Sequence, residues 1–207
     1  QAFWRIQFVP GNAALIVAGS ITPSELRKLA ESAFGNWPAA TASAPRLGES
    51  ALAQPRLVLV DRPGSPQTQL RVATIGVPRS SPDYTRLRVM NAILGGLFSS
   101  RINMNLRETN GYTYGASSQF SFWRGAGSFT VSTGVRTDVT APAVREIVNE
   151  VKRMIATDVT AEELTLARDA IALSLPGQFE TNESTAGALS AIFVYGLPLN
   201  YYATLPA

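Results

Sequence analysis

The stretch Leu106-Arg107-Glu108-Thr109-Asn110-Gly111-Tyr112-Thr113-Tyr114-Gly115-Ala116 joins two different patterns of secondary structure. Ile102 and Leu106 lie four residues apart, as on one face of a helix. At Asn110-Gly111 a residue in the left-handed conformation can end that helix at little cost. The aromatic and β-branched run that continues to Phe122 is typical of a strand. The sequence therefore predicts a helix, a turn and a strand that together carry one arginine and two tyrosines.

Similar patterns extend outward on both sides of this unit. Strands are predicted at 13–18 (AALIVA), 56–61 (RLVLVD), 69–77 (QLRVATIGV) and 128–135 (SFTVSTGV). Helix starts are predicted near residues 81–83, 99–100, 138–140, 160 and 181. From residue 56 onward, the predicted order is two strands, two helices, two strands and three helices. This order predicts an α+β fold, a two-layer sandwich with an antiparallel or mixed sheet and helices on one face.

The domain organisation follows from composition. Thr22-Pro23-Ser24-Glu25 has the features of a capped helix start, and Gly35 ends the apolar stripe that follows. Residues 1–38 are too few for a stable independent domain, so we interpret them as the β-α tail of a preceding domain. Residues 39–55 are rich in Ala, Ser, Thr, Gly and Pro and are predicted to be a linker. Residues 56–207 are expected to be the second family-type half of this organisation, with its C-terminal end missing.

Charge and hydropathy exclude several kinds of partner. The net charge is +3, and the 18 basic residues are scattered along the chain instead of forming a stripe for nucleic acid. No apolar run approaches the roughly 18 residues of a membrane-spanning helix. The chain opens at Gln1 without the basic and apolar regions of a signal peptide. We therefore expect neither a nucleic-acid partner nor a membrane span, and the compartment stays open.

The sequence contains no histidine and no cysteine. A catalytic zinc site ordinarily uses imidazole ligands, and a Ser-His-Asp triad needs an imidazole to move the proton. Carboxylates alone could hold calcium or magnesium, but no calcium-loop motif or acidic cluster occurs. No metal ligands are assigned in this chain, and any metal or general base for hydrolysis must come from elsewhere.

Several motifs together resemble a known family. Three of them occur in order: Gly95-Gly96-Leu97-Phe98-Ser99-Ser100-Arg101, Leu106-Arg107-Glu108 and Gly111-Tyr112-Thr113-Tyr114-Gly115-Ala116. This series is similar to the second, non-zinc-binding half of pitrilysin/insulysin-type zinc metallopeptidases, in the branch of the bacterial and mitochondrial processing peptidases. Residues 10–37 resemble the end of one family domain, residues 61–67 the opening strand of the next, and residues 160–167 its T-x-x-E-L-x-x-A helix.

The resemblance implies a role for two side chains. In this family zinc is bound by an H-x-x-E-H helix in the first half-domain or in a partner subunit. The second half faces it and supplies an arginine and a tyrosine seven residues apart, a spacing that Arg107 and Tyr114 match and Tyr112 does not. The tyrosine hydroxyl would stabilise the oxyanion of the attacked peptide carbonyl, and the arginine would hold the main chain of the substrate peptide. The peptide itself is expected to add as a strand to a sheet edge.

The chain departs from a complete enzyme because it lacks H-x-x-E-H, so these 207 residues are expected to be inactive alone. Three functions stay open: a substrate-binding, catalysis-assisting half or subunit of a zinc endopeptidase, a non-catalytic subunit that shapes a peptide chamber, and a structural scaffold. The partners implied are a zinc-bearing half-domain or subunit and a peptide substrate. The bacterial periplasm or cell envelope is expected if the parent protein carries a signal peptide.

Two further motifs have a structural interpretation. Gly95-Gly96 lacks the preceding strand and the G-K-[ST] of a phosphate-binding loop, so close packing or a hinge is favoured. Glu108 is interpreted as a surface charge or a partner of an arginine, and not as a general base. Arg101 is expected to anchor a helix end, and Tyr112 is assigned to packing.

Overall fold

The computed structural model describes residues 2–42, 48, 51 and 54–205 of the chain. It divides into two compact units, one made of residues 1–47 with 174–207 and the other of residues 48–173. Much of the predicted linker at 39–55 lies outside the described residues. The domain boundaries proposed from composition stay a prediction.

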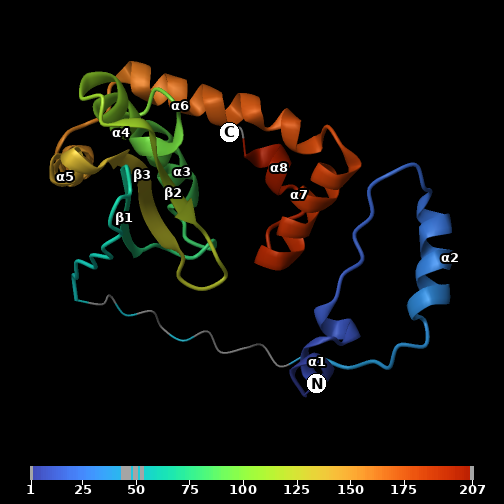
Figure 1. Ribbon diagram of the computed structural model, residues 1–207. Helices are drawn as coiled ribbons and strands as arrows, with labels where there is room; N and C mark the ends of the chain where they lie inside the picture. The colour runs from blue at the N-terminus through green and yellow to red at the C-terminus, as the bar shows by residue number, and fades with distance from the viewer. Residues whose placement is uncertain (1, 43–47, 49–50, 52–53, 206–207) are drawn as a thin grey trace. The chain divides into compact units, whose positions relative to one another are not determined.

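The larger unit contains a three-stranded antiparallel sheet (Figure 1). Strand β1 (Gln67–Ile75) and strand β2 (Thr113–Ser121) both pair with the central strand β3 (Ser128–Arg136). The sheet order is therefore β1-β3-β2, with β2 at one edge. This arrangement confirms the predicted α+β class and the antiparallel sheet.

Helices pack on one face of this sheet. Helix α3 (Tyr84–Asn91) continues as the π-helix η2 (Ala92–Gly96), and α4 (Arg101–Asn103) continues as the π-helix η3 (Met104–Thr109). After β3 come a 3₁₀ turn η4 (Thr137–Val139), helix α5 (Thr140–Ala156) and helix α6 (Ala161–Ser174). The core joins strands to helices through nine residues: Leu94, Ile102, Leu106, Ala116, Val131, Val135, Val139, Ala143 and Ile147.

The two faces of the sheet differ, as alternating side chains predict. Val131 and Val135 of β3 are fully buried against the helices. Ser132, between them, lies on the opposite face, where its hydroxyl accepts a hydrogen bond from Arg71 (3.2 Å). An antiparallel sheet with one covered face is therefore present in this unit.

Gly95 allows η2 to pack directly against β2. A Cβ atom at this position would overlap the backbone and side chain of Ser118. This supports close packing over a hinge as the reason for the Gly95-Gly96 pair.

We expect Gly95→Ala to destabilise this unit by about 1–3 kcal/mol, because the added methyl group must push η2 away from β2. Hydrogen exchange of the β2 amides measures the change for this unit alone. Gly187→Ala is the control, since a Cβ there meets no atom within 4 Å and alanine favours a helix. Unchanged β2 protection in Gly95→Ala would contradict the packing role.

Two predicted strands are wrong. Residues 13–18 and 56–61 have no strand structure, and Leu57 in the second run is 91% exposed. A strand is stable when its backbone N–H and C=O groups pair with those of a neighbouring strand. Within the described ranges, neither run has such a neighbour. The local preference for an extended chain is therefore not sufficient at these two places.

The smaller unit is helical in its described residues. It contains α1 (Ala2–Gln7), η1 (Pro10–Asn12), α2 (Pro23–Phe34), η5 (Pro176–Phe179), α7 (Asn182–Tyr195) and α8 (Tyr201–Thr204). The predicted capping box is confirmed, since the Thr22 hydroxyl accepts from the Glu25 amide and the Glu25 carboxylate accepts from the Thr22 amide. None of the described helices has the length and apolarity needed to cross a membrane.

Candidate functional site

The connection between η3 and β2 is held by its own backbone and one side chain. Asn110 donates from its side-chain amide to the carbonyl oxygen of Asn105 (2.9 Å) and to its side-chain oxygen (2.7 Å). Gly111 adopts the left-handed conformation (φ 61°), which a glycine accepts without strain. The Tyr112 amide then returns to the Leu106 carbonyl (2.8 Å). The predicted helix, turn and strand are therefore confirmed.

A β-bulge follows at the start of β2. Thr113 pairs with Val135 and Ala116 with Thr133, so β2 has one more residue than β3 between these pairs. The Thr113 hydroxyl donates to the Gly134 carbonyl (2.7 Å), and the Thr133 hydroxyl donates to the Gly115 carbonyl (2.9 Å). These bonds fix the bulge on both sides.

Tyr114 lies inside this bulge and is 90% exposed. Within the described part of the chain its hydroxyl has no hydrogen-bond partner, so it is free to meet a group from outside. Tyr112, two residues earlier, packs against the core cluster instead. The packing role predicted for Tyr112 is thereby confirmed. The two tyrosines therefore differ, since Tyr114 faces solvent and Tyr112 packs against the core.

Arg107 lies on η3, just before the turn. Its guanidinium carbon is 4.5 Å from the centre of the Phe98 ring, and its Nε is 3.3 Å from a carboxylate oxygen of Glu108. The side chain is 36% exposed, so part of the guanidinium faces solvent. Glu108 is therefore a partner of an arginine, as predicted. No described hydrogen bond joins Arg107 to Tyr114; the two lie at opposite ends of the same connection.

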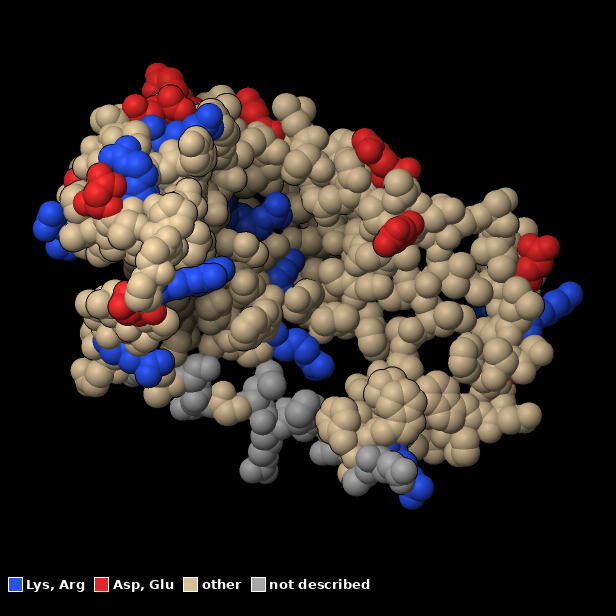
Figure 2. Space-filling model, in the orientation of Figure 1, with Lys and Arg blue, Asp and Glu red and all other residues tan. Residues whose placement is uncertain are grey.

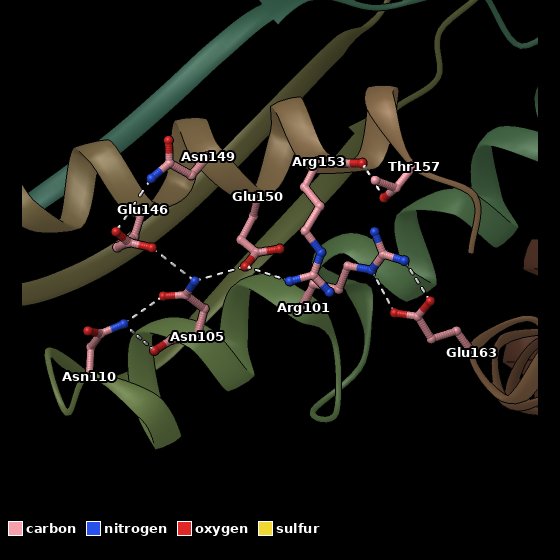
Figure 3. A network of polar contacts seen from close by, with 9 residues as sticks. All are labelled: Arg101, Asn105, Asn110, Glu146, Asn149, Glu150, Arg153, Thr157 and Glu163. Carbon is pink, nitrogen blue, oxygen red and sulfur yellow. Dashed lines mark hydrogen bonds and ion pairs between the residues drawn. The ribbon is translucent and has the colours of Figure 1, made fainter. Parts of the chain in front are cut away.

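A network of polar side chains fixes η3 to helix α5 (Figure 3). Asn105 donates to Glu146 (3.1 Å) and to Glu150 (2.8 Å), both on α5, and accepts from Asn110. Arg153 reaches the same carboxylate of Glu150 (3.3 Å). Because Asn105 is two residues before Arg107, this network fixes the position of the part of η3 that carries Arg107.

A second ion pair fixes the start of α4 to helix α6. Arg101 donates from Nε and Nη2 to the two oxygens of Glu163, each at 2.6 Å. Glu163 also accepts from the Thr160 amide (2.9 Å), and the Thr160 hydroxyl accepts from the Glu163 amide, so a capping box forms at the helix start predicted near residue 160. The Arg101 guanidinium, helped by that amide, lowers the pKa of Glu163 from 4.5 to about 2. The same carboxylate raises the pKa of Arg101 above its ordinary value. Arg101 therefore anchors a helix end, as predicted.

The described residues of this chain do not form a zinc site. Histidine and cysteine are absent from the sequence. Among the described residues no group of three acidic, imidazole or thiol side chains gathers to hold a metal ion. On the face shown in Figure 2, basic side chains are interspersed with acidic and uncharged ones.

Sequence reasoning missed two residues of the site region. The Phe98 ring contacts the Arg107 guanidinium, and Asn103 donates to the Phe98 carbonyl and accepts from the Ala116 amide. The sequence showed Phe98 only as one residue of a motif and did not indicate its contact with Arg107. No local pattern indicated a role for Asn103, because its hydrogen-bond partners are five and thirteen residues away in the sequence. At the helix start predicted near residues 99–100, the Ser100 side chain makes no capping hydrogen bond.

Comparison with known proteins finds two bacterial relatives whose names describe zinc proteases. The chain is 28% identical over 142 residues to an uncharacterised zinc protease of Streptomyces coelicolor, which covers 66% of this chain and 31% of that protein. It is 25% identical over 174 residues to an uncharacterised zinc protease of Mycobacterium tuberculosis, which covers 83% of this chain and 40% of that protein. The chain therefore spans less than half the length of these relatives.

A solved structure and a family model extend the comparison. The peptidase M16 inactive domain from Pseudomonas fluorescens superposes with a TM-score of 0.81 and 26% identity, covering 91% of this chain and 45% of that one. The model of the family described as the peptidase M16 inactive domain matches residues 1–171. Since that match covers most of the chain, the protein belongs to the peptidase M16 inactive domain family, the C-terminal half of M16 zinc proteases.

Proposed function

We propose that this chain is the substrate-binding, catalysis-assisting half of a zinc-dependent endopeptidase. In this proposal zinc is bound by a partner half-domain or subunit, and Arg107 and Tyr114 are the contribution of this chain. The observation that carries the proposal is the β-bulge that presents Tyr114, 90% exposed and without a partner among the described residues, on the strand that directly follows the Arg107 helix.

Tyr114 suits the stabilisation of a negative charge. Its hydroxyl is a hydrogen-bond donor that no described neighbour occupies, and the bulge holds its backbone on both sides. A donor that is fixed before the reaction stabilises an oxyanion without reorganisation at the moment when charge develops. The hydroxyl would therefore donate to the oxygen of the peptide carbonyl under attack.

Arg107 suits the binding of a peptide main chain. A guanidinium has five N–H donors in a planar fork, and Nε of Arg107 lies 3.3 Å from the Glu108 carboxylate. The Phe98 ring supports one face of the fork and limits the orientations it can adopt. The outer N–H groups would hold carbonyl oxygens of the substrate and fix its register.

The edge of β2 beside this site is already occupied. Asn103 accepts from the Ala116 amide (3.0 Å), and Asn91 donates to the Ser118 carbonyl (3.0 Å). A peptide strand cannot pair with those two backbone groups. We therefore place the substrate across the exposed sides of Arg107 and Tyr114, and not on the β2 edge next to Ala116.

We expect Arg107→Ala to raise KM about 10- to 100-fold, the loss of one or two charge-assisted hydrogen bonds, with a smaller change in kcat. The measurement is steady-state peptide cleavage by this chain assembled with its zinc-bearing partner. Arg86→Ala is a matched control, because Arg86 is an exposed arginine whose partner is Asp83 on another part of the surface. Equal kinetics for the Arg107 variant and its control would argue against a substrate-binding role.

A second function is a non-catalytic subunit that shapes a peptide chamber. It is favoured by the description of the matched family as an inactive domain. In that case substitutions at Arg107 and Tyr114 would leave kinetics unchanged, and only assembly with the partner would respond to changes in this chain.

A further inference from the structure

We propose that Asn103 is a positioning residue that couples the support of Arg107 to the strand that carries Tyr114. The inference rests on the proposed function and assigns a task to a residue that does not touch the substrate. Asn103 lies on α4, is 4% exposed, and uses both ends of its side-chain amide.

The nitrogen of the Asn103 side-chain amide binds the backbone of Phe98, the residue whose ring contacts Arg107. Nδ2 of Asn103 donates to the Phe98 carbonyl (2.6 Å). Phe98 is 66% exposed, so burial alone does not fix the position of its side chain. Because Arg107 stacks on that ring, the hydrogen bond to the Phe98 backbone limits where the guanidinium can lie.

The oxygen end holds the strand that carries Tyr114. Oδ1 of Asn103 accepts from the amide of Ala116 (3.0 Å), which is the first residue to pair with β3 after the bulge. The Thr113 hydroxyl fixes the other side of the bulge. Tyr114 therefore lies between two fixed points, and one of them depends on Asn103.

The chain offers a close comparison in Asn91. This residue bridges a helix to the same edge of β2, donating to the Ser118 carbonyl (3.0 Å) and accepting from the Ser118 hydroxyl (2.8 Å). It acts two residues further along β2 and contacts neither Phe98 nor the bulge. If Asn103 were only a structural link between helix and strand, Asn91 and Asn103 should have equivalent effects on catalysis.

The test is a double-mutant cycle in the assembled enzyme. Asn103→Ala is expected to lower kcat/KM about 10- to 100-fold, as expected when reacting groups are displaced slightly. In the Tyr114→Phe background, Asn103→Ala should lower kcat by a much smaller factor than it does in the parent enzyme. The reason is that the Tyr114 hydroxyl, which Asn103→Ala would misplace, is already absent. Asn91→Ala should reduce kcat by less than about twofold and by the same factor in both backgrounds.

Asn103→Asp separates the two ends of the amide. The carboxylate keeps an acceptor for the Ala116 amide and loses the donor to the Phe98 carbonyl, so KM should rise about tenfold while kcat stays within about twofold. This variant exchanges one NH₂ for one oxygen, and it decides the question if Asn103→Ala does not fold. Hydrogen exchange of the Ala116 amide should be unchanged in Asn103→Asp and faster in Asn103→Ala.

The outcomes are distinguishable. If Tyr114→Phe lowers kcat but Asn103→Ala has the same effect in both backgrounds, the positioning role is overturned and the proposed function stands. Wild-type KM in Asn103→Asp overturns the link to Arg107. If Tyr114→Phe leaves kcat unchanged and Arg107→Ala leaves KM unchanged, the proposed function fails, and the positioning role fails with it.

Discussion

Replacing Tyr114 by phenylalanine in the assembled enzyme is expected to lower kcat about 10- to 1,000-fold and to leave KM within about twofold. The substitution removes one hydroxyl and keeps the ring. Since Tyr114 is 90% exposed and its hydroxyl has no hydrogen-bond partner in the described part of the chain, the substitution removes no hydrogen bond from the folded state. The loss in kcat therefore measures an interaction made in the transition state, in a cleavage assay with saturating peptide.

Tyr112→Phe is the matched control, because it makes the same chemical change two residues earlier on a ring that packs against the core. We expect its kcat to stay within about twofold of the parent value, and its thermal unfolding temperature to report any packing effect. If the two variants had the same kcat, the oxyanion role of Tyr114 would be untenable. The chamber-forming function would then be the better description.

The sequence predicted the segment from Leu106 to Ala116 well because its signals are local. A helical spacing, a glycine that accepts a positive φ and a β-branched run act within a few residues of one another. The structure has η3, Gly111 at φ 61° and β2 in that order. The runs at 13–18 and 56–61 carry equally clear strand signals, but strand formation also requires a partner that local preference does not supply.

The bulge and its supports could not be predicted in the same way. The extra residue between Thr113 and Ala116 becomes visible only once β2 is aligned with β3. Asn103 and Phe98 belong to the site because of contacts across the fold. The resemblance identified Arg107 and Tyr114 as candidates, whereas the way in which the fold presents them depends on these longer-range contacts. The roles of both residues stay predictions until the kinetic experiments are done.

Replacing Glu163 by alanine is expected to destabilise the larger unit by about 3–5 kcal/mol, because it leaves the Arg101 guanidinium buried without its partner. The two side chains make paired hydrogen bonds of 2.6 Å, and the Arg101 side chain is only 6% exposed. Hydrogen exchange of the β3 amides measures the loss in this unit. Adding Arg101→Met should recover much of the stability, because an apolar side chain of similar length removes the unpaired charge.

The stabilisation that Glu163 provides should decrease as the pH is lowered. The pKa of Glu163 is about 2 in the folded chain and 4.5 for the ordinary carboxyl, so its contribution is fully present above about pH 4.5. That contribution, about 3 kcal/mol for this difference in pKa, is lost as the pH falls toward 2. Glu163→Ala should therefore flatten the stability profile between these limits. Asp83→Ala, which removes an exposed ion pair with Arg86, should change stability by less than about 1 kcal/mol. If Glu163→Ala and Asp83→Ala gave similar small losses, the Arg101–Glu163 pair would not be what fixes α4, and with it the start of the Arg107 segment, to helix α6.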